Sequence, residues 1–454
     1  MAIPNKWHRC RLADVADINP DSLGPDWPYE HIQYVDISSV GEGMLKESPH
    51  RLSLSEAPSR ARRLVKAGDT VLSTVRPNRR SMFFVRETIP DLVVSTGFAV
   101  IRPRQEVIEP RYLYAIVFDR RFTAYLVSRQ RGAAYPAVLP SDIAEAEILL
   151  PPLPEQRAIA HILGALDDKI ELNRRMNETL EAMAQALFKS WFVDFDPVVV
   201  NALRAGNPIP EKFAARAARY RDNPDRLGLP EDILRLFPAR FVDSELGPIP
   251  EGWEVSSVGK EFKVTMGQSP PGSTYNENGE GLPFFQGRRD FGFRYPSYRV
   301  YCTAPTRTAN AGDTLVSVRA PVGDINMAFE TCCIGRGLAA IRHKSGSRSY
   351  TYYAMRALSE RLRSYESDGT VFGAITKKHF DNLSSIAPAL ETVTLFEKLV
   401  FPVDEKIRVL EEQSRTLAAL RDTLLPKLIS GELRIKDPEK FVAAIPLLSE
   451  EVRT

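Results

Sequence analysis

The sequence predicts a mixed α/β protein built as two copies of one unit, each an α+β domain followed by a long helix. Short sequence blocks recur in the same order in both halves of the 454-residue chain. In addition, two long segments carry apolar residues at alternating steps of three and four, the heptad pattern of a coiled coil. We expect these two helices to pair as an antiparallel intramolecular coiled coil, which gives the chain a pseudo-twofold duplication.

The composition is that of an ordinary globular protein. With 43% hydrophobic and 26% charged residues, the chain has enough apolar material for more than one core. It contains no uninterrupted apolar run of about 18 residues, so no membrane-spanning helix is expected. The first residues lack the apolar core of a signal peptide, which predicts a cytoplasmic location. Four cysteines without a Cys-x-x-Cys spacing and six scattered histidines predict no metal site.

Three repeated blocks predict the duplication. Ala67–Ser73 (Ala-Gly-Asp-Thr-Val-Leu-Ser) returns as Ala311–Ser317 (Ala-Gly-Asp-Thr-Leu-Val-Ser). Gly97–Arg102 returns as Gly337–Arg342. The block at 132–151 then lies over 369–388 without a gap, and the same offset continues through both long helices. A fixed offset over this length is hard to obtain by chance, so we interpret it as an internal repeat.

The patterns divide the chain into six expected segments. They are a first α+β domain at 1–150, a helix within 151–196, a connector at 197–250, a second α+β domain at 251–388, a second helix within 389–433 and a C-terminal tail at 434–454. Both domains should contain short strands, such as Thr70–Val75, Ser81–Val85 and Thr314–Val318, and a helical segment at Pro110–Ser128 or Ser349–Tyr365. In the connector we expect weak helices at Ala214–Tyr220 and Glu231–Leu236.

The two long helices should bury a common seam. At ~1.5 Å per residue each is roughly 55 Å long, and such a helix cannot bury its apolar stripe alone. Asn173 and Asn177 inside the seam would fix its register at some cost in stability. The alternative is two separate amphipathic helices, each packed on its own domain. The predicted seam consists of Leu163, Leu166, Ile170, Asn173, Asn177, Leu180, Val403, Ile407, Leu410 and Leu417.

Catalytic motifs are missing from the sequence. It has no P-loop and no Gly-x-Ser-x-Gly elbow. An amino-methyltransferase needs an aromatic ring after two prolines to stack on the flipped base, whereas Gly272 follows Pro270-Pro271. Asp167-Asp168-Lys169 and Asp404-Glu405-Lys406 match half of a metal-dependent nuclease motif. Their place in a heptad favours charged outer positions of the coiled coil, so we expect a chain that is not catalytic by itself.

Several segments in combination resemble the specificity subunit of type I restriction–modification enzymes (HsdS). They are Leu150–Arg157 (Leu-Pro-Pro-Leu-Pro-Glu-Gln-Arg), Phe188–Phe195, Asp243–Gly247 with Ile249–Trp253, and Leu424–Leu433. The repeated Gly-Asp blocks and Gly267–Pro271 look like its target-recognition domains. The resemblance covers nearly the whole chain. One departure is Ala389–Val393, where that family usually keeps Pro-x-Pro-Glu-Gln.

The resemblance implies a mechanism and a set of partners. Each α+β domain would be a target-recognition domain that reads one half of a bipartite, asymmetric DNA sequence, and the helices would set the spacer. The helices would also dock two modification subunits (HsdM), which carry S-adenosylmethionine and flip the adenine. Two motor-nuclease subunits (HsdR) would use ATP and magnesium, while this chain would carry no cofactor. The alternative is a specificity subunit of a methylation-only or other phage-defence assembly without restriction.

Local basic patches supply the candidate DNA contacts. The formal net charge is only +2, so the patches suit a protein that touches phosphate with particular faces. Asn and Arg are side chains that pair bidentately with adenine and guanine edges. Phosphate contact and plain solvation remain the alternatives for each residue, and none is assigned a base. The candidates are Arg76, Asn78, Arg79, Arg80, Gln286, Arg288, Arg289, Arg294, Arg319, Lys377, Lys378 and His379.

Overall fold

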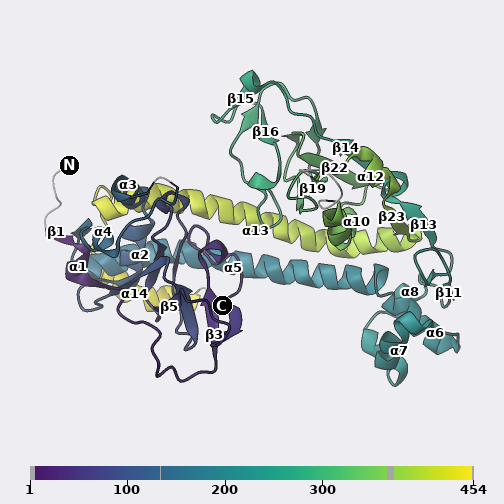
Figure 1. Ribbon diagram of the computed structural model, residues 1–454, viewed down its shortest axis with the longest axis horizontal. Coiled ribbons are helices and arrows are strands. Elements are labelled where there is room, and N and C mark those ends of the chain that lie inside the picture. The colour runs from purple at the N-terminus through teal and green to yellow at the C-terminus, as the bar shows by residue number, and fades with distance from the viewer. Residues whose placement is uncertain (1–5, 133, 366–372, 452–454) are drawn as a thin grey trace. The chain divides into compact units, whose positions relative to one another are not determined.

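The computed structural model describes residues 6–132, 134–365 and 373–451. Contacts within the chain divide it into two compact units: unit 1 is Met1–Asn173 with Gln413–Thr454, and unit 2 is Arg174–Glu412. The two long helices, α5 (Leu153–Phe192) and α13 (Leu390–Ser430), each contribute to both units (Figure 1). Each unit therefore combines an α+β domain with a segment of both helices.

The domain of unit 1 contains two four-stranded sheets. The first, in the antiparallel order β2-β9-β6-β7, consists of β2 (Ala16–Ile18), β9 (Phe98–Pro103), β6 (Thr70–Ser73) and β7 (Met82–Phe84). The second consists of β4 (His50–Ser53), β3 (His31–Val35), β8 (Leu92–Ser95) and β5 (Ala61–Leu64), with β3 and β8 parallel. Beside them, β1 (His8–Arg11) pairs with β10 (Glu147–Leu150). Its short helices are α1 (Leu12–Val15), α2 (Pro110–Phe118), α3 (Arg120–Arg129) and α4 (Pro140–Ala144).

The domain of unit 2 has the same plan. Its first sheet, in the antiparallel order β14-β22-β19-β20, consists of β14 (Phe262–Met266), β22 (Leu338–His343), β19 (Thr314–Ser317) and β20 (Ile325–Met327). The second consists of β15 (Tyr275–Asn276), β17 (Tyr301–Cys302), β16 (Leu282–Phe285), β21 (Cys332–Ile334) and β18 (Thr308–Ala309), with β16 and β21 parallel. Beside them, β13 (Glu254–Ser257) pairs with β23 (Ser384–Ala387). Its short helices are α9 (Val258–Glu261), α10 (Arg348–Ala357), α11 (Ser359–Ser364) and α12 (Lys377–Asn382).

The predicted duplication is confirmed by this topology, and the structure explains the repeated blocks. The aspartate of the Ala-Gly-Asp block and the arginine that ends the second block form an ion pair in each unit. Arg102 Nε lies 2.9 Å from Asp69 Oδ1, and Arg342 Nε lies 2.7 Å from Asp313 Oδ1. The second oxygen of each aspartate accepts a backbone N–H three residues earlier in the chain. The motifs therefore recur because they fasten neighbouring strands of the same sheet. Positions 369–372 of the third repeated block lie outside the described residues.

Each predicted helical segment that follows the strands is split in two. The segment Pro110–Ser128 becomes α2 and α3, because Asp119 adopts an extended conformation and its carboxylate accepts the N–H of Arg121 as an N-cap. In unit 2, Leu358 separates α10 from α11. An aspartate at a break is chemically suited to cap the next helix, but a regular apolar pattern on both sides conceals the break.

The two long helices pair with each other, as predicted. In unit 1, Arg421 of α13 forms an ion pair with Asp167 of α5 at 2.8 Å, and the Asn173 amide donates to Gln413 Oε1 at 2.9 Å. In unit 2, the Asn177 amide donates to Glu411 Oε1 at 3.3 Å. Because residue numbers fall along α13 as they rise along α5, the segments run antiparallel in each unit. The predicted seam residues are buried in five cases and half-buried in the other five.

The connector folds as a small helical layer on the aromatic core of unit 2. It contains α6 (Asp196–Ala205), α7 (Ala214–Arg221) and α8 (Glu231–Leu234), followed by the strand pair β11 (Phe241–Val242) and β12 (Ile249–Pro250). The sequence predicted α7 and α8 but missed α6, whose Pro197 and three valines are unusual in helices. Proline is accepted in the first turn of a helix, and the valines are fully buried. Helix α14 (Pro438–Glu451) in the C-terminal tail was also not predicted.

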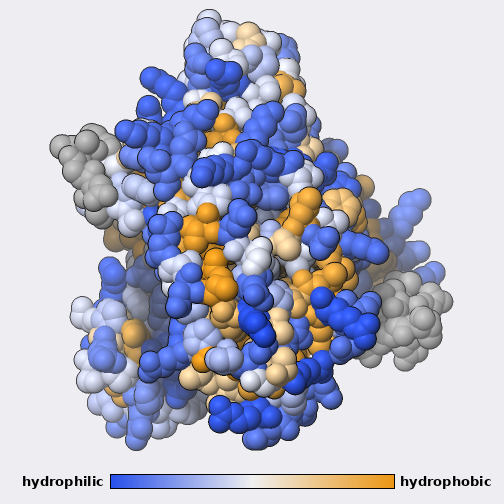
Figure 2. All heavy atoms as spheres, turned by 90° about the vertical axis from the view of Figure 1, so that its right-hand side faces the viewer, coloured by the Kyte–Doolittle hydropathy of each residue, from blue (hydrophilic) through white to orange (hydrophobic). Residues whose placement is uncertain are grey.

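Figure 2 shows a face of the molecule on which apolar residues gather in the middle, with hydrophilic residues around them. In and around the connector, the large apolar side chains with substantial exposure are Val193, Leu236, Val242 and Leu390. Contiguous apolar surface, such as the patch in Figure 2, is typical of protein–protein contacts. Among the described residues, every helix is too short or too polar to cross a bilayer.

Candidate DNA interface

In unit 1, the candidate residues lie on a tight loop that follows β6. A single 3₁₀ turn, Pro77–Arg79, is flanked by Arg76 at φ 50° and Arg80 at φ 54°, both in the left-handed region. Residues other than glycine rarely adopt this conformation, and such strain collects at functional sites. The loop leaves the side chains of Asn78 and Arg79 exposed to solvent. These two residues can therefore contact a ligand without rearrangement.

Arg80 anchors this loop. Its side chain is only 7% exposed, and its Nε donates to Glu42 Oε1 at 2.8 Å. The other guanidinium nitrogens donate to the Thr123 hydroxyl and to the Phe118 carbonyl, and the guanidinium lies 5.0 Å from the centre of the Phe118 ring. The structure thus gives Arg80 an internal role in place of the predicted DNA contact, because every one of its donors is directed into the protein.

Arg76 is half-buried beside a second loop. Its backbone N–H donates to the Pro136 carbonyl at 2.7 Å, and its guanidinium lies 5.1 Å from the centre of the Tyr135 ring. Tyr135 is 72% exposed, so this cation–π pair lies at the surface. Arg76 therefore remains near the candidate interface, and Tyr135 joins it as a residue that the sequence did not single out.

Replacing Arg80 with methionine is expected to lower the free energy of unfolding by about 1–3 kcal/mol, the cost of leaving buried polar partners unsatisfied. Methionine fills much of the same space but cannot bond to Thr123 or to the Phe118 carbonyl. Urea unfolding followed by circular dichroism measures the change. Arg79→Met is the matched control and should shift stability by less than about 0.5 kcal/mol, as is usual for exposed positions. Equal effects of the two substitutions would contradict the anchoring role.

In unit 2, Gln286, Arg288 and Arg289 follow the last residue of β16, and all three are exposed. Arg288 forms an ion pair with Asp324. Gly337 makes the position of Gln286 possible, because a Cβ atom on this glycine would lie 2.4 Å from the Gln286 carbonyl oxygen. The close approach is used for a hydrogen bond of 3.0 Å from Gly337 N–H to that carbonyl. The backbone at Gln286 is therefore fixed while its side chain remains free to contact a ligand.

Hydrogen bonds bring Arg319 to the same end of the first sheet of unit 2, β14-β22-β19-β20, which is its main sheet. The Gly337 carbonyl accepts the N–H of Val318, and the Val318 carbonyl accepts the N–H of Ile375, both at 2.9 Å. Arg319 and the two lysines that begin α12, Lys377 and Lys378, are exposed. One end of the sheet thus gathers exposed Gln286, Arg288, Arg289, Arg319, Lys377 and Lys378. Arg336, exposed between Gly335 and Gly337, belongs to this set and was missed; its Gly-Arg-Gly setting was the available signal.

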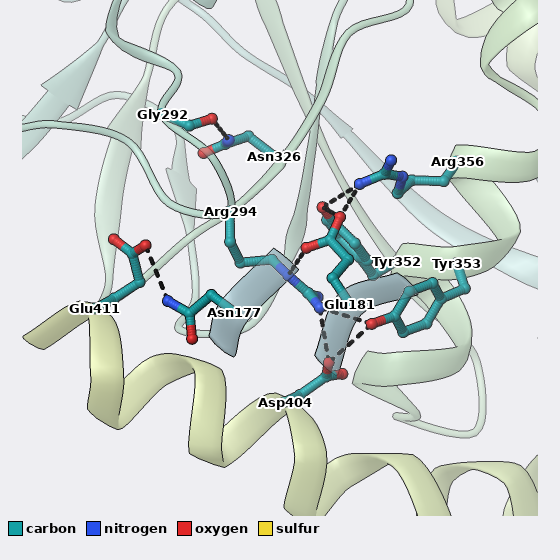
Figure 3. Close-up of polar contacts among 10 residues, drawn as sticks. All are labelled: Asn177, Glu181, Gly292, Arg294, Asn326, Tyr352, Tyr353, Arg356, Asp404 and Glu411. Carbon is teal, nitrogen blue, oxygen red and sulfur yellow. Dashed lines mark hydrogen bonds and ion pairs between the residues drawn. The ribbon is translucent and has the colours of Figure 1, made fainter. Parts of the chain in front are cut away.

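Two candidates of unit 2 have internal roles. His379 is half-buried, its ring stacks on Tyr365 with centroids 4.8 Å apart, and its Nδ1 accepts the Thr376 N–H in the capping box of α12. Arg294 is 0% exposed and lies among Glu181, Tyr353 and Asp404 (Figure 3). Its predicted place at the DNA surface is corrected, because the whole guanidinium is enclosed by protein.

In the acidic pairs of the long helices, Asp167, Asp168 and Asp404 contact arginines of other elements. Glu405 instead pairs with Arg408 on its own helix, as expected for an outer position. Arg111 donates two hydrogen bonds, of 2.9 and 3.1 Å, to the Asp168 carboxylate, which also pairs with Arg86. Burial, followed by the nearby charge of Arg86, lowers the pKa of Arg111. Asp404 is buried and pairs with Arg294. Within the described ranges, no group of three or more His, Cys, Asp or Glu residues is placed to hold a metal ion.

Comparisons with known proteins show what this chain is similar to. Residues 4–182 match the family model described as type I restriction modification DNA specificity domain. The HsdS subunit of Thermoanaerobacter tengcongensis is 31% identical, over 95% of this chain and 99% of that chain, with a TM-score of 0.37. The HindI specificity subunit of Haemophilus influenzae is 26% identical over 84% of this chain and 90% of its own length. The type I S subunit from M. genitalium is 14% identical, over 94% of this chain and 98% of that chain, with a TM-score of 0.51.

The duplicated fold and these sequence similarities define a DNA-recognition protein. The chain belongs to the family of type I restriction–modification specificity subunits. Its role is DNA sequence specificity within a multi-subunit system, and it is not the catalytic subunit.

Proposed function

We propose that the domains at 1–150 and 251–388 are target-recognition domains, each of which reads one half of a bipartite, asymmetric DNA site. The observation that carries the proposal is a pair of equivalent sheet ends that bear different exposed side chains. After β6, unit 1 presents Asn78 and Arg79, whereas unit 2 presents Arg319 and the loop that begins at Gln286. Equivalent scaffolds with unlike loops would read unlike half-sites, so the complete site would not be palindromic.

The chemistry of these loops supports contact with DNA. Arginine pairs with guanine and asparagine or glutamine with adenine through two hydrogen bonds in the major groove. The neighbouring lysines would instead meet phosphates, which position the protein without reading sequence. We therefore assign base contact first to Asn78, Arg79 and Gln286, and phosphate contact to Lys377 and Lys378.

The long helices, within 151–196 and 389–433, would set the spacer between the half-sites and dock partner subunits. We propose two modification subunits that carry S-adenosylmethionine, and two motor-nuclease subunits that use ATP and magnesium, all acting in the cytoplasm. The exposed apolar side chains of Val193 and Leu390, which lie at the end of α5 and the start of α13, support a protein partner near the helix ends. The connector at 197–250 and the tail at 434–454 would complete the respective units.

The test is methylome sequencing of a host that carries this gene together with its modification partner. We expect methylated adenines in one bipartite, non-palindromic sequence with a fixed spacer. The purified chain alone is expected to transfer no methyl group from radiolabelled S-adenosylmethionine and to cut no DNA, because its sequence contains no catalytic motif. Methylation at a palindrome, at a contiguous short site, or by the isolated chain would contradict the proposal. Cleavage of unmethylated DNA after addition of a motor-nuclease subunit separates restriction from a methylation-only assembly.

A further inference from the structure

A cluster of four charged side chains lies in unit 2, outside the candidate DNA interface, and three of the four are buried. Two arginines, Arg294 and Arg356, meet two carboxylates, Glu181 and Asp404 (Figure 3). The carboxylates come from different long helices, Glu181 from α5 and Asp404 from α13. The arginines come from the recognition domain. The formal charges balance, which lowers the cost of burying Arg294, Glu181 and Asp404, while the Arg356 side chain stays 33% exposed at the edge of the cluster.

In this cluster Arg294 uses both the fork of N–H donors on its guanidinium group and the flat face of that group. Its Nε donates to Glu181 Oε2 at 3.1 Å, and its Nη2 donates to Asp404 Oδ1 at 2.8 Å and to the Tyr353 hydroxyl at 2.7 Å. The guanidinium lies 3.8 Å from the centre of the Tyr352 ring. Burial by itself would lower the pKa of Arg294, but Tyr352 and Asp404 raise it above its ordinary value, so the side chain is charged. Lysine has neither the fork nor the flat face that this site uses.

The same segment is attached by its backbone to the recognition domain. The Arg294 carbonyl accepts the N–H of Met327 at 2.9 Å, and the Gly292 carbonyl accepts the Asn326 amide at 3.0 Å (Figure 3). Both acceptors bond to residues of β20, a strand of the main sheet. The segment also continues directly from the loop with Gln286, Arg288 and Arg289, which Asp290 closes by accepting Arg299 at 2.9 Å. Arg294 therefore joins three parts of unit 2: the exposed loop, the main sheet and both long helices.

Unit 1 fastens its domain to the helices in a different way. There, Asp167 and Asp168 stand at the positions that correspond to Asp404 and Glu405 by the constant offset of the repeat. Arg111 and Arg86 of the domain meet Asp168, while Asp167 is occupied by Arg421 of α13. The Asp168 side chain is 45% exposed, compared with 8% for Asp404. The enclosed, two-helix attachment is thus a property of unit 2.

From these contacts we infer that Arg294 is a positioning residue that fixes the second recognition domain on the helix pair, and that it thereby determines which spacer length the protein accepts. The inference rests on the proposed function. Arg294 touches no DNA in this role; it acts through the loop and sheet that it fastens. Loss of its fork would let the second domain shift or rotate on the helices, so sites whose halves are one base pair closer or farther apart would become acceptable.

The experiment compares two arginine substitutions in the full chain, assembled with its modification subunits. Arg294→Met keeps much of the side-chain volume but removes the fork and the charge. Arg342→Met is the matched control, because it breaks an Arg–Asp pair with Asp313 inside the same domain and leaves the helices untouched. Each complex is given DNA with the natural spacer or with one base pair added or removed, and initial methylation rates are measured. If the Arg294→Met chain does not assemble with the modification subunits, Arg294→Lys and Glu181→Gln replace it in the experiment, because they keep more of the cluster.

The readout is the ratio of the methylation rate on the natural spacer to the rate on the altered spacers. A misplacement of about 1 Å can cost up to about 100-fold in rate, so we expect Arg294→Met to reduce this ratio about tenfold and Arg342→Met to leave it unchanged. An equal loss of rate on all three DNAs, with the ratio preserved, would overturn the inference and leave Arg294 with a purely structural role. Failure of the proposed function looks different, because the wild-type complex would then show no bipartite site at all.

Discussion

Replacing Asn78 and Arg79 together by alanine is expected to reduce methylation at sites that carry the cognate first half by about 100-fold or more. A bidentate contact to a base contributes about 1–3 kcal/mol, so two such contacts account for this loss. Both side chains are exposed on the strained turn between Arg76 and Arg80, and neither supports the core. Methylation kinetics on a panel of DNAs, each with one base pair changed, would measure the effect.

The panel also separates base contact from phosphate contact. Loss of a base contact removes the preference at one position of the first half-site, whereas loss of a phosphate contact weakens all sequences alike and reduces the salt dependence by about one ion per contact. Arg104→Ala is the control. Arg104 follows β9 at the end of the sheet opposite the loop, since Thr70 pairs with Ile101 and Ser73 with Phe98. Unchanged preferences in the double variant, or changed preferences at the second half-site, would contradict the assignment.

The parts of the fold that the sequence predicted are those with a local or periodic cause. The heptad steps predict the paired helices because one apolar stripe must meet another. The Gly-Asp blocks predict the duplication because Asp69 and Arg102, like Asp313 and Arg342, form the same ion pair between neighbouring strands. Such features are repeated in the chain and therefore visible in it. Helix α6 was not predicted, because Pro197 and the valines after it are also typical of a strand or of the end of a helix. The burial that favours a helix here is not visible in the sequence.

The roles of individual arginines were not predictable in the same way. Arg80 stands beside Arg79, and nothing in the local sequence tells them apart. Only the fold shows that Arg80 faces Glu42, 38 residues away, and that Arg294 faces Glu181 and Asp404, 113 and 110 residues away. Of these acidic partners, only Asp404 is noticeable in the sequence, where the heptad pattern favours an outer position of the coiled coil. A run of basic residues thus locates a functional face. Whether a given arginine in it is exposed or anchors the fold depends on carboxylates that are distant in the sequence.

Substituting Trp191 with alanine is expected to destabilise unit 2 by about 3–5 kcal/mol, the usual cost of deleting a fully buried aromatic side chain. Trp191, near the end of α5, is 0% exposed and lies within 5.1 Å of Phe237 and 6.1 Å of Phe396, measured between ring centroids. These rings come from the connector and from α13, so the cavity would open where three parts of unit 2 meet. Urea unfolding followed by circular dichroism measures the loss.

The chemistry of the Trp191 ring predicts how the loss of stability depends on the residue that replaces it. The indole N–H of Trp191 has no hydrogen-bond partner among the described residues, so the side chain acts through its apolar area and its ring contacts. Trp191→Phe keeps most of both and should cost less than half as much as Trp191→Ala. Met183→Ala, on the same helix but 62% exposed, should change stability by less than about 0.5 kcal/mol. If Trp191→Phe proved as damaging as Trp191→Ala, a polar contact of the indole would have to carry the effect, and the purely apolar account of this core would be wrong.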